Sequence, residues 1–431
     1  MELPVLLLNI IFIVISALLI YPSIKRVIKY KSNSIADYII LLIAIFNCIP
    51  VICDIFIGIP TYVYWYSPFE LVIADFDVCL IYNVYIIVTL GALQYYAYKT
   101  TLRNKEAYKY EEVYLSSFRR PIIDTTLILL PIAFVVLKYG IGVFRGYSML
   151  GSRNIESGDS QLINQMITLS VYIYSTRYFS KPRKARDFFF MLAFFFLLIW
   201  LNGKRYMIVS IGEIIFYLYQ MTKRKTTRRV KLGLIMMFAV VFIVAFSIYY
   251  LTTVKVNMAS DYLYGTLRVD FGRDDVTKYV IKQVLLERKN IIDYPGQTVI
   301  ADLLMFVPRK IWPAKPYPHY RYLTASILGV RLQNIPAGTT PSLFEMSLCN
   351  FGWFGIPITV IFLIMLCKLT DKRNNLSFKV IMLLIFTNLL SQALDAIMIM
   401  IPILIVYVLA YKQLFSITRR KSSEISANTL D

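Results

Sequence analysis

The sequence predicts an all-α polytopic membrane protein with about 11 transmembrane helices, and three observations support this fold class. First, 58% of the 431 residues are hydrophobic and 15% are aromatic, and the mean hydropathy is +0.61. A soluble domain of this size does not need so much apolar material. Second, apolar runs recur at about 20 residues, the length with which a helix crosses a bilayer. Third, Lys and Arg gather in alternate connections between these runs.

Each apolar run is expected to form one spanning helix. Two regions are less regular, because "LNGKR" interrupts 187–222 and Asp395 joins the last two runs tightly. In the first run the basic residues follow the apolar part and no small-residue cleavage site is present, which favours a helix over a removed signal peptide. The expected spans are 4–24, 37–58, 71–97, 122–144, 160–180, 187–202, 206–222, 232–252, 341–367, 380–394 and 396–411.

The formal net charge of +20 has a simple explanation in such a protein. Basic runs such as "KRVIKYK", "RYFSKPRKAR", "KRKTTRRVK" and "KQLFSITRRK" fall on alternating connections, so one orientation places all of them in the cytoplasm. We therefore expect the N-terminus outside, the C-terminus in the cytoplasm, and no nucleic-acid partner.

This orientation divides the chain into four parts. Residues 1–252 form an N-terminal membrane bundle of about eight helices, and 341–411 form about three C-terminal helices. Residues 253–340 form one large extracytoplasmic loop with short helices, and 412–431 form a cytoplasmic tail.

Two short helices are expected in the large loop. The segment "DDVTKYVIKQVLLERKN" has the spacing of an amphipathic helix at the membrane surface, with Asp274 as N-cap. The segment "TVIADLLMFV" predicts a second helix that Pro308 ends.

The stretch "FVPRKIWPAKPYPHYRY" concentrates prolines, cations and aromatic residues in the same loop. The expected orientation places this loop outside the membrane. The preference of Lys and Arg for cytoplasmic loops therefore does not explain its charge. Guanidinium groups bind phosphate in a bidentate fork, which makes Arg309, with Lys315 in support, a candidate for an anionic ligand. Trp312 is a candidate interface anchor or sugar-stacking face.

Other outward cations are candidates for the same ligand. Arg153 in "GSRN" and both Lys204 and Arg205 in "NGKR" lie beside glycines, where backbone N–H groups can approach an oxyanion. Arg273 lies in "FGRDD". The alternative for each is an ordinary cation that extends to the interface from a helix end.

The candidate general bases are His319, the only histidine, and Glu345, about one turn into a predicted spanning helix. His319 could also be structural, and Glu345 could pair with an outer arginine. Asp302 and Asp270 are weaker alternatives. No motif for a metal or a nucleotide is present, so we expect no metal and no cofactor.

The motifs "FGRDD", "FVPRKIWPAKP" and "GTTPSLFEMSLCNFGWFGI", with many spans and a large loop before the last helices, resemble the Wzy-type oligosaccharide repeat-unit polymerases of O-antigen and capsular polysaccharide assembly. "NGKR" is similar to a Gly-x-Arg element of this family and of the O-antigen ligases.

The resemblance implies a GT-C-like fold in the bacterial inner (plasma) membrane and an outward-facing, metal-independent glycosyltransferase site. The substrate would be an undecaprenyl-pyrophosphate-linked oligosaccharide, and the partners a chain-length regulator and a flippase besides the lipid bilayer. Arg153, Arg205, Arg273 and Arg309, with Lys204 and Lys315, would bind pyrophosphate and glycan, and His319 or Glu345 would be the base. An O-antigen ligase is the nearest alternative. A transporter or flippase of lipid-linked glycans is the third.

Overall fold

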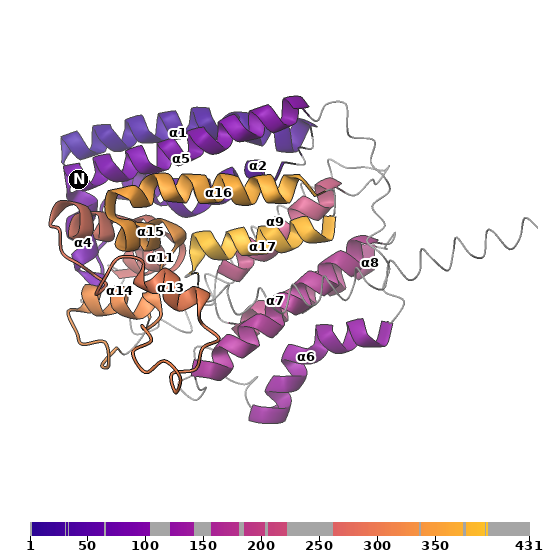
Figure 1. Ribbon diagram of the computed structural model, residues 1–431. Coiled ribbons are helices and arrows are strands. Elements are labelled where there is room, and N and C mark those ends of the chain that lie inside the picture. The colour runs from indigo at the N-terminus through magenta and orange to yellow at the C-terminus, as the bar shows by residue number, and fades with distance from the viewer. Residues whose placement is uncertain are drawn as a thin grey trace, which may run out of the picture.

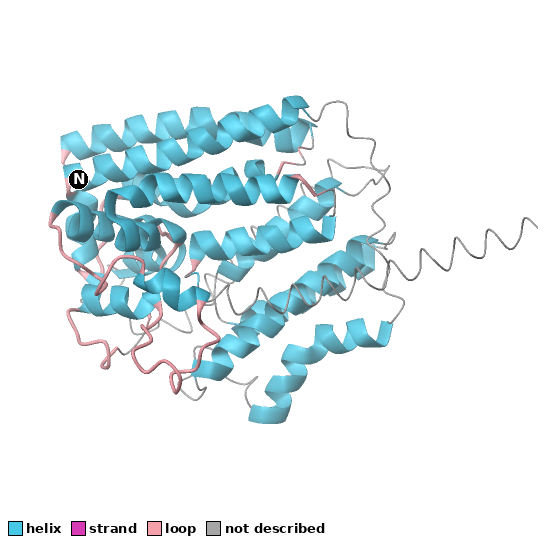
Figure 2. Ribbon diagram, viewed as in Figure 1, coloured by secondary structure: helices cyan, strands magenta, loops and turns pink. Residues whose placement is uncertain are grey.

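The structure is a computed structural model, and its elements are helices throughout the part of the chain that it describes (Figure 2). The described residues are 2–30, 32, 34–63, 66–103, 121–141, 157–180, 185–202, 206–221, 262–335, 338–373, 376–392 and 394.

Long helices form a bundle (Figure 1). They are α1 (Leu3–Tyr30), α2 (Ile35–Ile43) continued by the π-helical η1 (Ala44–Cys48) and α3 (Ile49–Ile57), α5 (Phe76–Arg103), α6 (Pro121–Tyr139), α7 (Ser157–Ser180), α8 (Ala185–Asn202), α9 (Tyr206–Met221), α16 (Gly355–Asp371) and α17 (Leu376–Ser391). Within it α1 packs on α5, α6 on α7, and α9 on α17.

Among the described residues, four helical stretches are long and apolar enough to cross a membrane: Leu3–Lys29, Ile35–Ile57, Phe76–Thr101 and Leu343–Asp371. This supports the predicted membrane protein of all-α class. The expected spans 232–252 and 396–411 lie outside the described residues.

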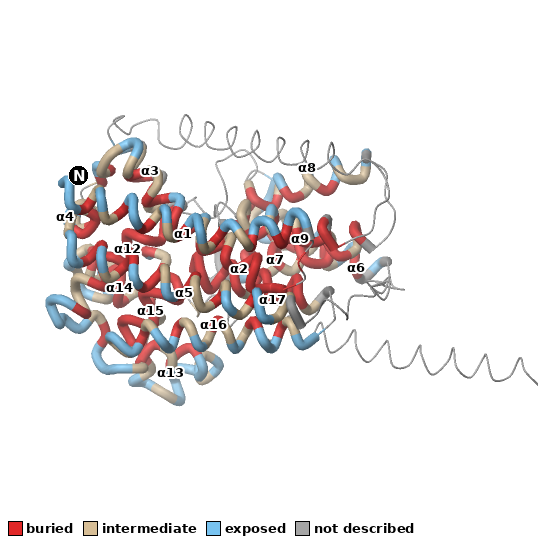
Figure 3. Tube along the Cα trace, turned by 90° about the horizontal axis from the view of Figure 1, so that it is seen from above, coloured by how far each residue is buried: buried red, intermediate tan, exposed pale blue. Residues whose placement is uncertain are grey.

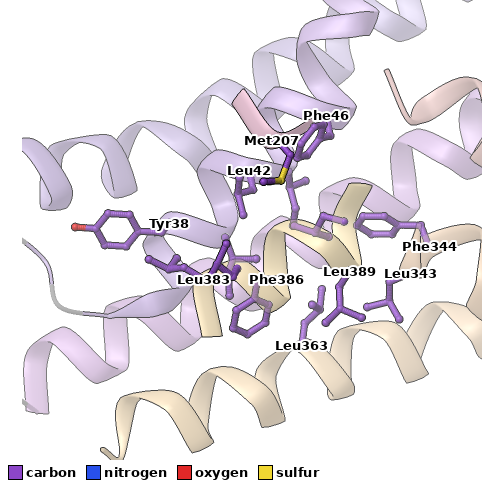
Figure 4. Close-up of a cluster of buried hydrophobic side chains, with 14 of the residues drawn as sticks. Tyr38, Leu42, Phe46, Met207, Leu343, Phe344, Leu363, Leu383, Phe386 and Leu389 are labelled. Carbon is purple, nitrogen blue, oxygen red and sulfur yellow. The ribbon is translucent and has the colours of Figure 1, made fainter. Parts of the chain in front are cut away.

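The bundle is held together by a continuous apolar core, part of which is shown in Figure 4. Side chains from α2, η1, α9, α15, α16 and α17 meet there. The labelled ones are Tyr38, Leu42, Phe46, Met207, Leu343, Phe344, Leu363, Leu383, Phe386 and Leu389.

Short helices gather at one end of the bundle, the end at which α1 begins (Figure 1). They are α4 (Pro68–Ala74), α11 (Leu263–Phe271), α12 (Asp274–Val280) with the π-helical η7 (Ile281–Leu286), α13 (Gln297–Leu303), α14 (His319–Leu328) and α15 (Leu343–Phe351). The described part of the large loop thus lies at the same end as the N-terminus.

The helix predicted to lie at the membrane surface is buried instead. All seven residues of α12 are buried, including Lys278. Asp274 is the first helical residue, next to Arg273 at the N-cap, and its carboxylate contacts other charged side chains. For residues 274–280 the surface prediction was wrong because ion pairs within the protein bury the polar face, whereas η7 after them is partly exposed, with Leu286 at 40%.

The predicted span 341–367 is divided. Helix α15 ends at Phe351, a 3₁₀ turn at Gly352–Phe354 follows, and α16 begins at Gly355. A Cβ placed on Gly355 would lie 2.5 Å from the carbonyl oxygen of Ser347, so α15 folds closely against the start of α16. Glycine permits this approach because it has no side chain.

The proline-rich stretch also differs from the prediction at both ends. Helix α13 ends at Leu303, five residues before Pro308, so this proline does not end it. Helix α14 begins at His319 directly after Pro318, although no helix was expected there. Turns and irregular backbone connect the two helices, as the prolines predict.

Candidate functional site

Six of the nine predicted site residues lie in the described part of the chain. Arg153, Lys204 and Arg205 lie outside the described residues. The other six are Arg273, Arg309, Trp312, Lys315, His319 and Glu345.

Arg309 and Lys315 hold the proline-rich loop in shape. Arg309 Nη1 donates a hydrogen bond to the carbonyl of Lys315 (2.6 Å) and Nη2 to that of Pro316 (3.1 Å). Lys315 Nζ donates to the carbonyls of Met305 (2.7 Å) and Val307 (2.9 Å). Desolvation and the charge of Arg309 lower the pKa of Lys315. The exposed Arg309 keeps further N–H donors beyond these two bonds.

Tyr317 brings a second arginine to Arg309. The Cζ atom of Arg309 lies 4.5 Å from the ring centroid of Tyr317, and that of Arg321 lies 5.0 Å from it. Within the described segments, neither guanidinium forms an ion pair with a carboxylate. We call these three side chains the Arg309–Tyr317–Arg321 stack. Cation–π contacts thus hold two positive charges near one aromatic ring.

Sequence reasoning had not selected Tyr317 or Arg321. The available signal was their spacing of four residues across the start of α14. Trp312 lies in the same loop with a half-buried side chain, and its backbone N–H donates to the carbonyl of Pro308 (3.1 Å).

His319 lies beneath the surface as the first residue of α14. Its exposure is 0%, and neither ring nitrogen has a hydrogen-bond partner among the described residues. Desolvation lowers the pKa of His319 to about 4, so its imidazole is neutral at pH 7. A substrate hydroxyl would reach it only if the covering residues moved.

Glu345 caps the helix to which it belongs. One of its carboxylate oxygens accepts from the backbone N–H of Ser342, and the other from Ser342 Oγ (2.5 Å) and Thr277 Oγ1 (3.0 Å). With Ser342 as N-cap this is a capping box. The bond from Thr277 connects α15 to α12. Glu345 forms no ion pair with an arginine among the described residues, so that alternative is not realised there.

Arg273 connects α12 to the end of α17. Its Nε donates to the carbonyl of Ser391 (2.9 Å) and its Nη1 to that of Gly272 (2.6 Å), while its backbone N–H donates to the carbonyl of Phe46 (3.1 Å). Its exposure is 4%. The guanidinium is thus occupied by backbone carbonyls rather than presented at the surface.

Of the two weaker acidic candidates, Asp302 is buried on α13 and Asp270 belongs to α11. Within the described ranges, no three side chains of His, Cys, Asp and Glu come together as possible metal ligands.

Sequence reasoning missed a buried group of five charged side chains, which we call the Arg268 cluster: Asp54, Arg268, Asp274, Asp275 and Lys278. Arg268 lies 2.7 Å from Asp54, 2.5 Å from Asp274 and 2.8 Å from Asp275, and Lys278 lies 3.0 Å from Asp274. Each member is at most 3% exposed. The cluster joins α3, α11 and α12, and so positions the small helices on the bundle.

The three carboxylates of this cluster outnumber its two cations. Desolvation and the charges of Asp274 and Asp54 raise the pKa of Asp275 to about 7, although Arg268 opposes this. Tyr62 donates a hydrogen bond to Asp275. Arg268 and Lys278 together lower the pKa of Asp274 despite its burial. Asp275 is therefore the member that gains or loses a proton near neutral pH.

Comparison with known proteins gives this chain no relatives. No protein-family model, no curated protein and no solved structure matches it.

Proposed function

We propose that the protein is a polysaccharide polymerase of the bacterial inner membrane. It would move a growing glycan from undecaprenyl pyrophosphate onto the non-reducing end of another lipid-linked repeat unit. The motif resemblance and the all-α membrane architecture support this proposal, and the expected fold is GT-C-like.

The observation that carries the proposal is the Arg309–Tyr317–Arg321 stack. Two guanidinium groups without a carboxylate partner in the described segments form a site for a divalent or higher anion. In this reaction negative charge accumulates on the leaving pyrophosphate, and preorganised cations stabilise it. Arg153, Lys204 and Arg205 are proposed as further ligands of pyrophosphate or glycan, whereas Arg273, whose guanidinium is buried against backbone carbonyls, is not.

Of the two candidate bases, the geometry supports His319. Both carboxylate oxygens of Glu345 are occupied in the capping box, whereas both ring nitrogens of His319 lack a partner in the described part of the chain. A neutral imidazole can accept the proton of the attacking sugar hydroxyl once substrate reaches it.

Deletion of the gene tests the function. The expected result is surface glycan that carries single repeat units, seen as a band at the bottom of the gel ladder. Accumulation of full-length polymer on its lipid carrier would instead identify a ligase.

Arg321→Ala tests the site, because within the described residues its guanidinium lies over the ring of Tyr317, while Arg309 and Lys315 donate the side-chain hydrogen bonds to the carbonyls of the loop. Loss of Arg321 therefore leaves these hydrogen bonds intact. We expect chain extension to fall by about 10²–10³-fold, as for other lost donors at a developing anion. Arg331→Ala, at an exposed position after α14, is the matched control. A normal ladder from Arg321→Ala at matched expression would remove the stack from the site.

A further inference from the structure

Helix α13 buries its polar side chains and exposes its apolar ones, the reverse of a helix in a soluble protein. Its polar residues Gln297, Thr298 and Asp302 are at most 3% exposed. Its large apolar residues face outward, with Ile300 at 42% and Leu303 at 61% exposure, and Leu304 directly after the helix is 46% exposed. A helix in contact with water places its apolar stripe inward, so this arrangement indicates apolar surroundings outside.

Hydrogen bonds hold α13 in this orientation. The side-chain oxygen of Gln297 accepts from the backbone N–H of Asp293 (2.7 Å), and its Nε2 donates to the hydroxyl of Tyr322 (2.6 Å). Thr298 donates to Asn350 Oδ1 at the end of α15 from Oγ1 (3.0 Å) and from its backbone N–H (3.2 Å). Rotation of the helix to bury its exposed residues Ile300 and Leu303 would break these buried hydrogen bonds.

The loop after α13 continues the apolar surface. Phe306 is 69% and Ile311 is 75% exposed. Arg309 and Lys310, both exposed, lie between them in sequence. Figure 3 shows the exposed segment around α13 at the edge of the molecule. Apolar side chains with neighbouring cations are typical of segments that lie in the headgroup region of a bilayer.

We propose that residues 297–312, which we call the interfacial segment, lie in the bilayer at the boundary between headgroups and acyl chains. Leu303, Leu304, Phe306 and Ile311 enter the acyl region, and Lys310 contacts lipid phosphate. The lipid bilayer is the partner that fits this segment by charge. Its anionic phosphates lie above hydrocarbon, which matches a cation beside outward-facing apolar side chains. The inference is independent of the proposed enzymatic function.

Fluorescence of the full-length protein in nanodiscs of phosphatidylethanolamine and phosphatidylglycerol tests this inference. A polarity-sensitive fluorophore is attached to Phe306→Cys, to Leu303→Cys as a second site, and to Arg331→Cys as the exposed control. Four native cysteines are buried and Cys53 is half-buried, so label taken up by the wild-type protein is measured under the same conditions and subtracted as background. Quenchers are a lipid with a nitroxide in its acyl chain and aqueous iodide.

We expect blue-shifted emission and several-fold stronger lipid-borne quenching at Phe306 and Leu303 than at Arg331. Iodide quenching as strong at these sites as at Arg331 would overturn the proposal. Protection from both quenchers would also overturn it, since a protein surface, such as a second copy of this chain, would then cover the segment.

The phosphate contact has its own test. Replacing phosphatidylglycerol by phosphatidylcholine should weaken lipid quenching at Phe306, and Lys310→Gln should remove that dependence. Equal quenching in both lipids for the unaltered Lys310 would refute the contact.

Discussion

Arg268→Met should strongly destabilise the protein, because the Arg268 cluster depends on this one side chain. Methionine has a similar length but no charge. Arg268 makes four hydrogen bonds that would be lost, two to Asp54 (3.0 and 2.7 Å) and two to Asp274 (2.5 and 2.8 Å). Only Lys278 would then compensate the buried carboxylates.

The expected magnitude follows from two limits. Each hydrogen bond to a charged group contributes about 1.5–3 kcal/mol, so four bonds set an upper limit of about 6–12 kcal/mol. The carboxylates can take up protons and so avoid part of this cost. Measured losses when one partner of a buried ion pair is removed are about 3–5 kcal/mol, which is the loss we expect for Arg268→Met.

Equilibrium urea unfolding in mixed micelles, followed by tryptophan fluorescence, measures this change. Lys289→Ala is the control, because Lys289 pairs with Glu287 at the surface with 67% of its side chain exposed, and its loss should have no measurable effect. The double variant Arg268→Met with Asp54→Asn should recover part of the loss, because it removes one orphaned charge. Wild-type stability of Arg268→Met would refute the inferred role of the cluster.

Three further predictions concern the same end of the molecule. Because the folded protein raises the pKa of Asp275 from 3.8 to about 7, the wild-type protein loses stability as the pH rises from about 4 to about 7. Asp275→Asn, which does not ionise, should therefore gain stability relative to wild type across that interval, and a constant difference in urea midpoint would contradict this. Glu345→Ala should lose about 1–2 kcal/mol in the same assay through loss of the capping box with Ser342, whereas unchanged unfolding would show that the cap contributes nothing. Gly355→Ala should lose about 1–3 kcal/mol, because its methyl group would collide with the carbonyl of Ser347, and a stable variant would mean that α15 can shift.

Short-range patterns were sufficient to predict much of the fold. The first long helix and the paired helices of 185–221 fall where their apolar runs predict them, because a helix needs a fixed apolar length to cross lipid. The same reasoning failed for α12, since a polar helix face looks the same in sequence whether water or buried ion pairs will surround it.

The candidate site was predicted in part. The role of Arg309 and Lys315 as anion ligands stays a prediction, and their bonds to backbone carbonyls and the approach of Arg321 to Tyr317 depend on the path of the loop. His319 is recognisable in the sequence as the only histidine, whereas its full burial follows from how α14 packs.

The sequence by itself determined that this is a helical membrane protein and which loop carries the densest charge, because hydropathy and charge are local properties of the chain. Only the tertiary structure decided which charges meet. Asp54 and Arg268 are 214 residues apart, and no local pattern predicts that pairing. The tertiary structure also decided which face of α13 is exposed, because that choice depends on hydrogen bonds from Thr298 to Asn350, on another helix.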